Sequence, residues 1–291
     1  MDEFTPVLIE TKNMRSYNAN GKIVYKDGSV EILEHGISEI ARRAYRKNEN
    51  IISVVLPSGI RRIKEAAFST CTSLESIVIP DSVTSIAGGA FEYCSSLKSV
   101  AIPPEVKTVC KSAFEFCESL ESVTLPDGLE KISDWAFRGC KSLIGINIPD
   151  TVMSIGSNAF TDCEKIADIE IPKSVLSIGS NAFSGCYELA NINIHSGENL
   201  FANRTVCIGS AAFYGDAKLV SIRIPKAVKS IPGNVFRGCD NLENIYYEGS
   251  KADWRKIKID KYGNDKLFGG IFSSVKRAKI HYNCEQTKIT P

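Results

Sequence analysis

Ser76 to Cys94 reads SIVIPDSVTSIAGGAFEYC, and from Ser99 the chain reads SVAIPPEVKTVCKSAFEFC, a shift of 23 residues. The pattern returns after another 23 residues, at Ser122, as SVTLPDGLEKISDWAFRGC. An aromatic residue marks every copy at one fixed position, and these markers are Tyr45, Phe68, Phe91, Phe114, Phe137, Phe160, Phe183, Phe213 and Phe236. Their spacing is 23 residues throughout, except for 30 residues between Phe183 and Phe213. A fixed period of this length predicts a solenoid in which each copy forms one turn of a stack.

The residue types of one copy predict the course of one turn. Residues 76–79 alternate between outward and apolar inward positions, which is typical of a strand with one buried face. Pro80 ends this strand because proline has no N–H to continue a ladder. Gly88-Gly89 permits a tight bend, and Ala90-Phe91 is expected to form a short helical turn that points the ring inward. Because one turn cannot bury its apolar side alone, we expect neighbouring turns to stack about 4.8 Å apart with parallel strands.

The full pattern runs from Cys71 to Phe91 as CTSLESIVIPDSVTSIAGGAF and is nearly complete again at 140–160. It resembles the BspA-like leucine-rich repeats of bacterial and protist surface proteins. The later segments IYYEGSKADWRKI and AKIHYN are similar to the C-terminal closure of that family. The resemblance covers nearly the whole chain and implies an α/β leucine-rich-repeat solenoid. In such a fold, 23-residue turns form a right-handed curved stack with a parallel β-sheet on the concave face, and short helical or 3-10 turns and loops elsewhere.

Three parts of the chain are expected to have different roles. Residues 1–45 are interpreted as an N-terminal cap, with a hairpin around the turn signal Asp27-Gly28 and a partial repeat. Residues 46–247 form the solenoid, with an insertion of seven residues near 196–205. Residues 248–291 form a C-terminal cap, in which Ser250 followed by Asp253 is typical of a helix N-terminus.

Composition and charge exclude several classes of function. The formal charge of +1 creates no overall field that would favour nucleic acid. The charge is uneven, since residues 249–291 carry ten Lys or Arg and four Asp or Glu, whereas the rest carries 25 and 30. No apolar run approaches the roughly 18 residues of a membrane-spanning helix, so no membrane insertion is expected. The first thirty residues lack the pattern of a signal peptide. If Met1 is the native start, the chain is expected in the cytoplasm, whereas the resemblance implies the cell surface or secretion.

Seven of the ten cysteines share one position, three residues after the ring, and they are Cys71, Cys94, Cys117, Cys140, Cys163, Cys186 and Cys239. Stacked side chains that point the same way are poorly placed for disulfides, so we expect a column of buried free thiols. Cys110, Cys207 and Cys284 lie off this column and are expected to be more reachable. Asp216 takes the column position after the insertion. Since a buried carboxylate needs a partner or water, the insertion is expected to open the solenoid there.

The sequence contains little that indicates catalysis. The three histidines, His35, His195 and His281, lie far apart along a stiff rod, so no Ser–His–Asp set can readily converge. No C-x-x-C pair, metal-spaced His/Asp cluster or phosphate loop occurs, so neither a metal nor a cofactor is expected. His195 and Cys207 share the long turn and are the pair that an enzyme would use. We predict that the protein is not an enzyme.

Two surfaces are candidates for binding a partner. One outward column of the sheet is small and polar and begins with Ser53, Ser76, Ser99 and Ser122. The next column changes from apolar to polar along the rod, and its candidate partner-binding residues are Val55, Val78, Thr124, Asn147, Glu170, Asn193, Arg223 and Tyr246. The rival surface is the long turn from Ser196 to Cys207, where Leu200 and Phe201 are apolar. A solvated sheet without any partner remains the alternative for the first surface.

We therefore predict a non-catalytic, adhesion-type solenoid that binds a protein or extracellular-matrix ligand, with a monomer as the favoured state. Binding is expected through the concave sheet, the long turn or both. The alternatives are an intracellular scaffold of the same fold and an enzyme that uses His195 and Cys207. The basic residues near the C-terminus favour an acidic partner, and they are Lys256, Lys258, Lys261, Lys276, Arg277 and Lys279. Nucleic acid is not expected, because aromatic platforms are not interleaved with these residues.

Overall fold

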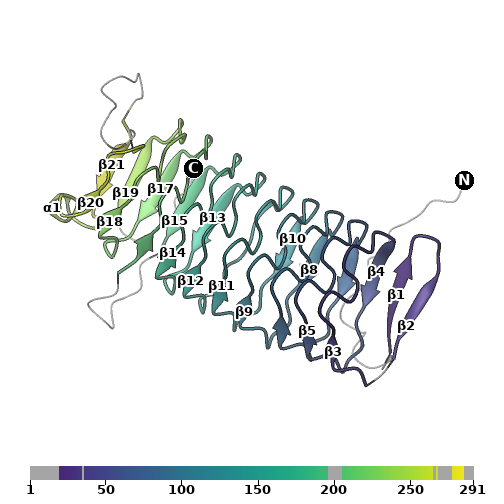
Figure 1. Cartoon of the computed structure of the whole chain (residues 1–291). Coiled ribbons are helices and arrows are strands. Elements are labelled where there is room, and N and C mark those ends of the chain that lie inside the picture. The colour runs from purple at the N-terminus through teal and green to yellow at the C-terminus, as the bar shows by residue number, and fades with distance from the viewer. Residues whose placement is uncertain (1–19, 35, 196–204, 265–266, 268–276, 285–291) are drawn as a thin grey trace, which may run out of the picture.

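A computed structural model describes residues 20–34, 36–195, 205–264, 267 and 277–284. The chain forms an elongated stack of rungs that runs from an N-terminal hairpin to a short helix at the other end (Figure 1). Most rungs contribute a long strand, a short strand and a corner that carries the ring. The stack is a leucine-rich-repeat solenoid, as the sequence predicts, and its described residues contain almost no helix.

The long strands lie on one face of the stack, which we call the long-strand face (Figure 1). The first sheet has the spatial order β10 (Ser122–Thr124), β8 (Ser99–Ala101), β6 (Ser76–Val78), β4 (Ile51–Val55), β1 (Gly21–Tyr25) and β2 (Val30–Leu33). The second sheet has the order β13 (Asp168–Ile171), β15 (Asn191–Ile194), β17 (Ser221–Ile224), β19 (Asn244–Tyr247) and β21 (Lys279–Tyr282). The solenoid strands pair in parallel and in register, so that Ser53 lies beside Ser76 and Val55 beside Val78. Only the hairpin strand β1 runs antiparallel to its neighbours β2 and β4.

The two sheets are separated by one rung, residues 144–148, that is not a strand. Gly145 occupies this rung at the position where the preceding rungs carry serine. Glycine weakens a strand interior because it offers no side chain to pack and loses more entropy on ordering. The core nevertheless continues through the interruption, since Leu143 and Ile148 are buried.

The short strands form a second set of ladders on another side of the stack. They are β3 (Glu39–Ile40), β5 (Arg62–Ile63), β7 (Ser85–Ile86), β9 (Thr108–Val109), β11 (Lys131–Ile132), β12 (Ser154–Ile155), β14 (Ser177–Ile178), β16 (Cys207–Ile208), β18 (Ser230–Ile231) and β20 (Lys258–Ile259). Each carries one outward residue followed by an inward isoleucine or valine. Ion pairs also join neighbouring rungs, as between Lys98 and Glu75 at 3.2 Å. Such exposed pairs contribute at most about 1 kcal/mol each.

The aromatic markers form one continuous stack inside the solenoid. From Tyr45 to Phe183 the centroids of neighbouring rings are 5.2–5.5 Å apart and the ring planes are nearly parallel. The separation rises to 6.0 Å between Phe183 and Phe213 and to 6.1 Å between Phe213 and Phe236. All eight phenylalanines of this stack are buried. The stack therefore passes the seven-residue insertion with only a small increase in spacing.

The corners around the rings are turns rather than the short helical segments expected, and each contains two left-handed residues. The first lies two residues before the ring, in the column Arg43, Ala66, Gly89, Ser112, Trp135, Asn158, Asn181, Ala211 and Asn234. The second lies two residues after the ring, in the column Lys47, Thr70, Tyr93, Phe116, Gly139, Asp162, Gly185, Gly215 and Gly238. Most of these residues are not glycine, so the conformation costs about 1–2 kcal/mol per residue.

Hydrogen bonds between rungs hold the corners in this conformation. In the rung of Phe68, the amides of Ala66, Phe68 and Thr70 donate to carbonyls of the next rung at 3.2, 2.8 and 2.6 Å. The same amides of the next rungs repeat this pattern. Because three donors per corner are satisfied in this way, the surrounding stack imposes the left-handed backbone on ordinary residues.

The seven column cysteines are buried and free, as predicted. They are more than small apolar fillers, because each thiol donates a hydrogen bond to the carbonyl of the ring residue in the preceding rung. Cys94 Sγ lies 3.2 Å from Phe68 O, and Cys117 Sγ lies 3.1 Å from Phe91 O. Burial raises the pKa of the six thiols from Cys71 to Cys186, with Cys71 reaching about 12. The column is therefore a ladder of protonated, unreactive donors.

Asp216 corrects the expectation that the insertion opens the solenoid. The residue is fully buried, and its Oδ1 accepts a hydrogen bond from the backbone N–H of Cys186 at 2.9 Å. Its Oδ2 has no hydrogen-bond partner. Burial raises the pKa of Asp216 well above its ordinary value. The carboxyl group thus finds one partner within the closed stack, and no opening towards water is needed.

Both ends of the stack are closed by structure that the sequence indicates. The hairpin β1–β2 turns at Gly28, whose φ is +81°. Behind the hairpin, the Glu31 carboxylate accepts hydrogen bonds from the hydroxyls of Tyr25 and Tyr45. At the other end, helix α1 (Lys251–Trp254) starts at Ser250, which forms a capping box with Asp253.

Candidate functional site

The outward residues of the first sheet form an apolar surface at the N-terminal end of the long-strand face. Val55 is half-buried, Val78 is 50% exposed, and Ala101 is exposed beside it. The hairpin extends this surface, because β1 pairs with β4 and β2 pairs with β1. Val30 and Ile32 of β2 point outward and are 52% and 56% exposed. We call these five residues the apolar half of the long-strand face.

Sequence reasoning missed the contribution of the hairpin. It interpreted residues 21–33 only as a cap, whereas the antiparallel register places Val24 beside Ser53 and Lys22 beside Val55. The signal was present in the alternation of β2, where Glu31 and Leu33 face inward and Val30 and Ile32 face outward. The strand order could not be read from the sequence, because it needs the pairing of β1 with β4.

The structure places the predicted partner-binding column in three states of exposure. Its exposed members are Val78, Thr124, Asn147 and Glu170. Its half-buried members are Val55 and Tyr246, and its buried members are Asn193 and Arg223. Leu200 and Phe201 of the long turn lie outside the described residues.

Asn193 and Arg223 are both buried, and Arg223 contacts a residue far along the chain. These side chains are 5% and 3% exposed, although their strand register points them outward. After β21 the chain turns back, since the amide of Cys284 donates to the carbonyl of Tyr247 at 3.3 Å. The guanidinium of Arg223 then donates to the carbonyl of Cys284 at 3.2 Å. Arg223 therefore holds a neighbouring segment of the protein and does not lie on an open surface.

Polar side chains of the second sheet are largely bound to one another. Asn191 Nδ2 donates to Asp168 Oδ1 at 2.8 Å, and Ser221 Oγ donates to Asn191 Oδ1 at 2.8 Å. A ring nitrogen of His195 contacts the carboxylate of Glu170. A partner that bound here would have to replace these hydrogen bonds, and replacement brings little net free energy.

Tyr246 belongs to the same polar region. Its ring stacks on His281 with centroids 4.8 Å apart, and His281 Nε2 lies 2.9 Å from Asn244 Oδ1. Burial, aided by the charge of Lys279, lowers the pKa of His281. The imidazole is thus neutral at physiological pH and acts as a structural link between β19 and β21.

His195 and Cys207 are placed on different sides of the rung. His195 follows β15 on the long-strand face and contacts Glu170 there. Cys207 begins the short strand β16, where it is exposed and lies beside Ser177 of β14. Among the described residues, the thiol of Cys207 therefore has no contact with the imidazole of His195.

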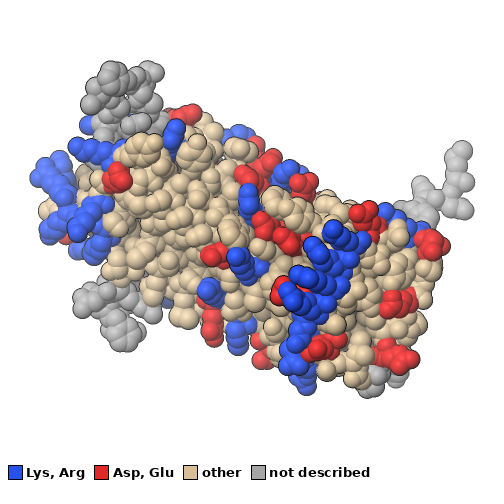
Figure 2. Space-filling model, in the orientation of Figure 1, with Lys and Arg blue, Asp and Glu red and all other residues tan. Residues whose placement is uncertain are grey.

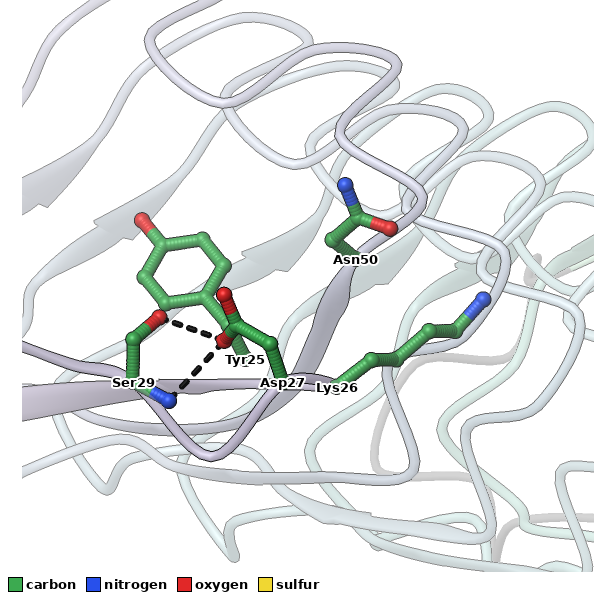
Figure 3. A pocket seen from close by; sticks show the side chains of 5 residues that line it. All are labelled: Tyr25, Lys26, Asp27, Ser29 and Asn50. Atoms are coloured by element: carbon green, nitrogen blue, oxygen red, sulfur yellow. Dashed lines mark hydrogen bonds between the residues drawn. The ribbon is translucent and has the colours of Figure 1, made fainter.

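A shallow cavity of about 260 Å³ lies at the turn of the hairpin (Figure 3). Its lining residues are Tyr25, Lys26, Asp27, Ser29 and Asn50. Asp27 Oδ1 accepts hydrogen bonds from the amide and the hydroxyl of Ser29, at 2.9 and 2.6 Å. These bonds lower the pKa of Asp27. The carboxylate thus holds the turn together and has no catalytic partner within the cavity lining.

Two further types of site are absent from the part of the chain that the structure describes. In that part, no three His, Cys, Asp or Glu side chains are grouped so that they could hold a metal ion. Among the same residues, no helix has the length and apolar character required to span a membrane.

Comparison with known proteins identifies the family. The family model described as "BspA type Leucine rich repeat region (6 copies)" matches residues 38–167 and 107–243. A leucine-rich repeat protein from Bacteroides ovatus is 25% identical, with 78% of this chain and 75% of that chain covered and a TM-score of 0.46. A leucine-rich cell surface protein from Faecalibacterium prausnitzii is 23% identical, with 84% and 97% covered and a TM-score of 0.41. A leucine-rich repeat protein from T. pallidum is 25% identical, with 68% and 86% covered and a TM-score of 0.44.

No curated protein matches the chain. The family is typical of surface-associated proteins that interact with other proteins, and its members are in general non-catalytic. The family match rests on the same residues that build the stack, including the ring column from Phe68 to Phe236 and its cysteines. Because the matched ranges together cover more than half of the sequence, the protein belongs to the BspA-type leucine-rich-repeat family.

Proposed function

We propose that the protein is a non-catalytic, adhesion-type module of the cell surface that binds an extended segment of a partner protein across the apolar half of the long-strand face. The observation that supports this most is the group of apolar side chains on one face, with Val55, Val78 and Ala101 on adjacent rungs and Val30 and Ile32 on β2. The two sets are separated by Lys22 and Val24 of β1. A single exposed valine is ordinary on a protein surface, but several apolar side chains grouped on one face are characteristic of an interaction site.

The neighbouring column explains why an extended segment fits. It consists of serines, beginning with Ser53, Ser76 and Ser99, whose small side chains allow a backbone to approach closely. The apolar column beside it offers one contact on each rung, about 4.8 Å apart, to an extended partner. A matrix protein that presents an extended segment would bind in the same way.

The edge of the sheet offers hydrogen bonds to a part of the partner that runs along β2. Within the described residues β2 pairs with β1 alone, so its other edge is unpaired. Tyr25 N donates to Ser29 O, and the antiparallel alternation then turns the amides and carbonyls of Val30 and Ile32 towards the free edge. Addition of a strand at a free edge is a recurrent mode of peptide recognition.

The experiment selects ligands from a displayed library of random peptides on the immobilised protein. The selected peptides are expected to alternate apolar and polar residues, and Val78→Asp is expected to weaken their binding about tenfold, because a desolvated charge costs at least about 1.4 kcal/mol. Met153→Asp is the matched control, since Met153 is 48% exposed outside the long-strand face. Equal losses for both variants, or ligands that survive Val78→Asp unchanged, would contradict the proposal.

The long turn from Ser196 to Cys207 stays a second predicted surface. Deletion of its seven extra residues is expected to leave binding of the selected peptides intact. If the deletion abolished binding and Val78→Asp left it unchanged, the binding site would be assigned to the long turn with Leu200 and Phe201.

An intracellular scaffold is the alternative, and the cysteines are the observation that favours it. The structure contains ten free cysteines, and disulfides are the usual state of cysteines in oxidising compartments. Antibody labelling of intact cells against lysed cells distinguishes the two locations. If the antibody labelled the protein only after lysis, the protein would be intracellular, and the same binding face would serve an intracellular partner.

A further inference from the structure

We propose that the C-terminal end of the stack carries a second binding surface, which recognises a linear acidic polysaccharide. This surface, the basic end patch, consists of Lys229, Lys251, Arg255, Lys258 and Tyr262. All five side chains are exposed. Figure 2 shows Lys and Arg gathered at the end of the stack where Figure 1 places α1, β18 and β20.

The fold brings these residues together from separate parts of the chain. Strand β20 pairs with β18 so that Lys258 lies beside Ser230, and the amide of Lys258 donates to the carbonyl of Lys229 at 3.0 Å. Lys251 and Arg255 belong to α1 and its C-cap, in the same terminal rung as β20. Tyr262 follows β20 and is anchored by its backbone, whose carbonyl accepts from the amide of Asn234 at 2.7 Å.

Two acidic groups lie near the patch. Asp260 is exposed, and its Oδ1 accepts a hydrogen bond from the amide of Tyr262 at 2.9 Å. The second, Asp253, is committed to structure. Asp253 accepts hydrogen bonds from Ser250 and ion-pairs with Lys226 at 3.3 Å and with Lys256 at 3.5 Å. The hydrogen bonds from Ser250 and the bond with Lys226 lower the pKa of Asp253 to about 2. Asp253 therefore stays ionised and neutralises its own two lysines.

The remaining cations of the patch have no carboxylate partner in the described part of the chain. Within those residues, Lys229, Lys251, Arg255 and Lys258 have no carboxylate within 4.0 Å. Lys229 Nζ donates only to the backbone carbonyl of Lys226, at 3.2 Å. Elsewhere on the stack some basic residues are paired, as Lys98 is with Glu75, Lys141 with Glu118, Lys218 with Glu188, Arg42 with Glu65 and Arg62 with Glu39, whereas other described basic residues have no ion pair. The four positive charges of the patch are therefore available to an external polyanion.

The chemistry of the patch favours a polymer over a single anion. Its charges sit on long exposed side chains, so each contact is weak and screened by salt, and only a ligand with repeated charges gains from several contacts together. A linear acidic polysaccharide presents such charges at regular intervals. It also presents the apolar C–H faces of its sugar rings, which suit the ring of Tyr262, at 67% exposure. Nucleic acids rely on several aromatic platforms, whereas the described part of this patch has one.

The test measures binding of a fluorescein-labelled heparin dodecasaccharide to the full chain by fluorescence anisotropy over a series of NaCl concentrations. The triple variant Lys251→Glu/Arg255→Glu/Lys258→Glu is expected to weaken binding at least about tenfold. It is also expected to reduce the magnitude of the slope of log K against log salt by about two, because each contact between a basic side chain and an acidic group of the oligosaccharide releases bound counterions. Lys98→Glu/Lys141→Glu/Lys218→Glu is the matched control, with an identical change in net charge on ion-paired positions. This control is expected to change binding less than about threefold, which is the range of indirect charge effects.

A third variant separates charge from stacking. Tyr262→Ala is expected to weaken binding several-fold and to leave the salt slope unchanged, since no charge is removed. Thermal melting checks that each variant is folded. Equal weakening by both triple variants would reduce the effect to overall charge and overturn the proposal. Stronger binding to phosphatidylglycerol vesicles than to the oligosaccharide, or equal binding of an uncharged dextran, would overturn it as well.

Discussion

Asp216→Cys is expected to stabilise the protein, and the gain is expected to grow as the pH rises. The wild-type carboxyl is fully buried and leaves Oδ2 without a partner, which costs about 1–3 kcal/mol. A cysteine would place a thiol where seven other rungs donate to the carbonyl of the preceding ring residue. The substitution gives up the 2.9 Å hydrogen bond from Cys186, worth about 1 kcal/mol. The net gain is therefore about 0–2 kcal/mol where the carboxyl is protonated.

The pH dependence follows from the raised pKa of Asp216. In the unfolded chain the carboxyl titrates near its ordinary value of 3.8, whereas burial keeps it protonated to higher pH in the folded protein. Between these two pKa values the folded state binds more protons, so the free energy of unfolding of the wild type falls as the pH rises. The loss is at most about 1.4 kcal/mol per pH unit for one proton. This loss of stability is absent below the pKa of Asp216 in the unfolded chain and complete above its pKa in the folded protein.

The assay is urea unfolding at pH 5 and at pH 8, followed by circular dichroism. The free energy of unfolding of Asp216→Cys is expected to exceed that of the wild type by a larger margin at pH 8 than at pH 5. Asp216→Asn is expected to lack the same pH-dependent loss of stability. Asp150→Asn, at an exposed position, is the control that keeps it. The thiol of Cys186 has a pKa raised by burial and does not titrate in this range. An equal margin at both pH values, or a wild type more stable than Asp216→Cys, would refute the reasoning.

Two further outcomes follow from the stack. Phe137→Ala removes a ring from its middle and is expected to cost roughly 3–5 kcal/mol, whereas Phe236→Ala near the end is expected to cost less in thermal melting, because each rung contacts only its neighbours; equal melting shifts would argue against this local stability. In native protein, a thiol reagent is expected to label Cys207 rapidly, Cys110 and Cys284 more slowly, and the seven column cysteines only upon unfolding; rapid native labelling of seven or more cysteines would contradict the buried ladder.

The parts of the fold that repeat could be predicted because each has a marker in the sequence. The ring column and the cysteine column appear as fixed residue types at a fixed spacing, and both are buried as expected. The left-handed corner columns have no such marker. One of them contains residues as different as Arg43, Trp135 and Asn158, because hydrogen bonds from the neighbouring rung, rather than residue type, impose the conformation.

The candidate binding site was only partly predictable, for reasons of distance along the chain. The strand register places Arg223 outward correctly, but its burial depends on Cys284, 61 residues away, which no repeat pattern marks. Val30 and Ile32 join the site only through the pairing of β1 with β4. Asp216 shows the same limit, since residue type indicated the need for a partner and the stack supplied it through the amide of Cys186.

The corner hydrogen bonds between rungs have a mechanical consequence. Since they hold each rung to its neighbour, a force applied at the two ends of the described stack would peel rungs off one after another. Release of one 23-residue rung frees about 80 Å of extended chain. The rung between Phe183 and Phe213 holds 30 residues and would free about 105 Å. The force–extension record of a single molecule would thus be a staircase of even steps in which one longer step marks the position of the insertion.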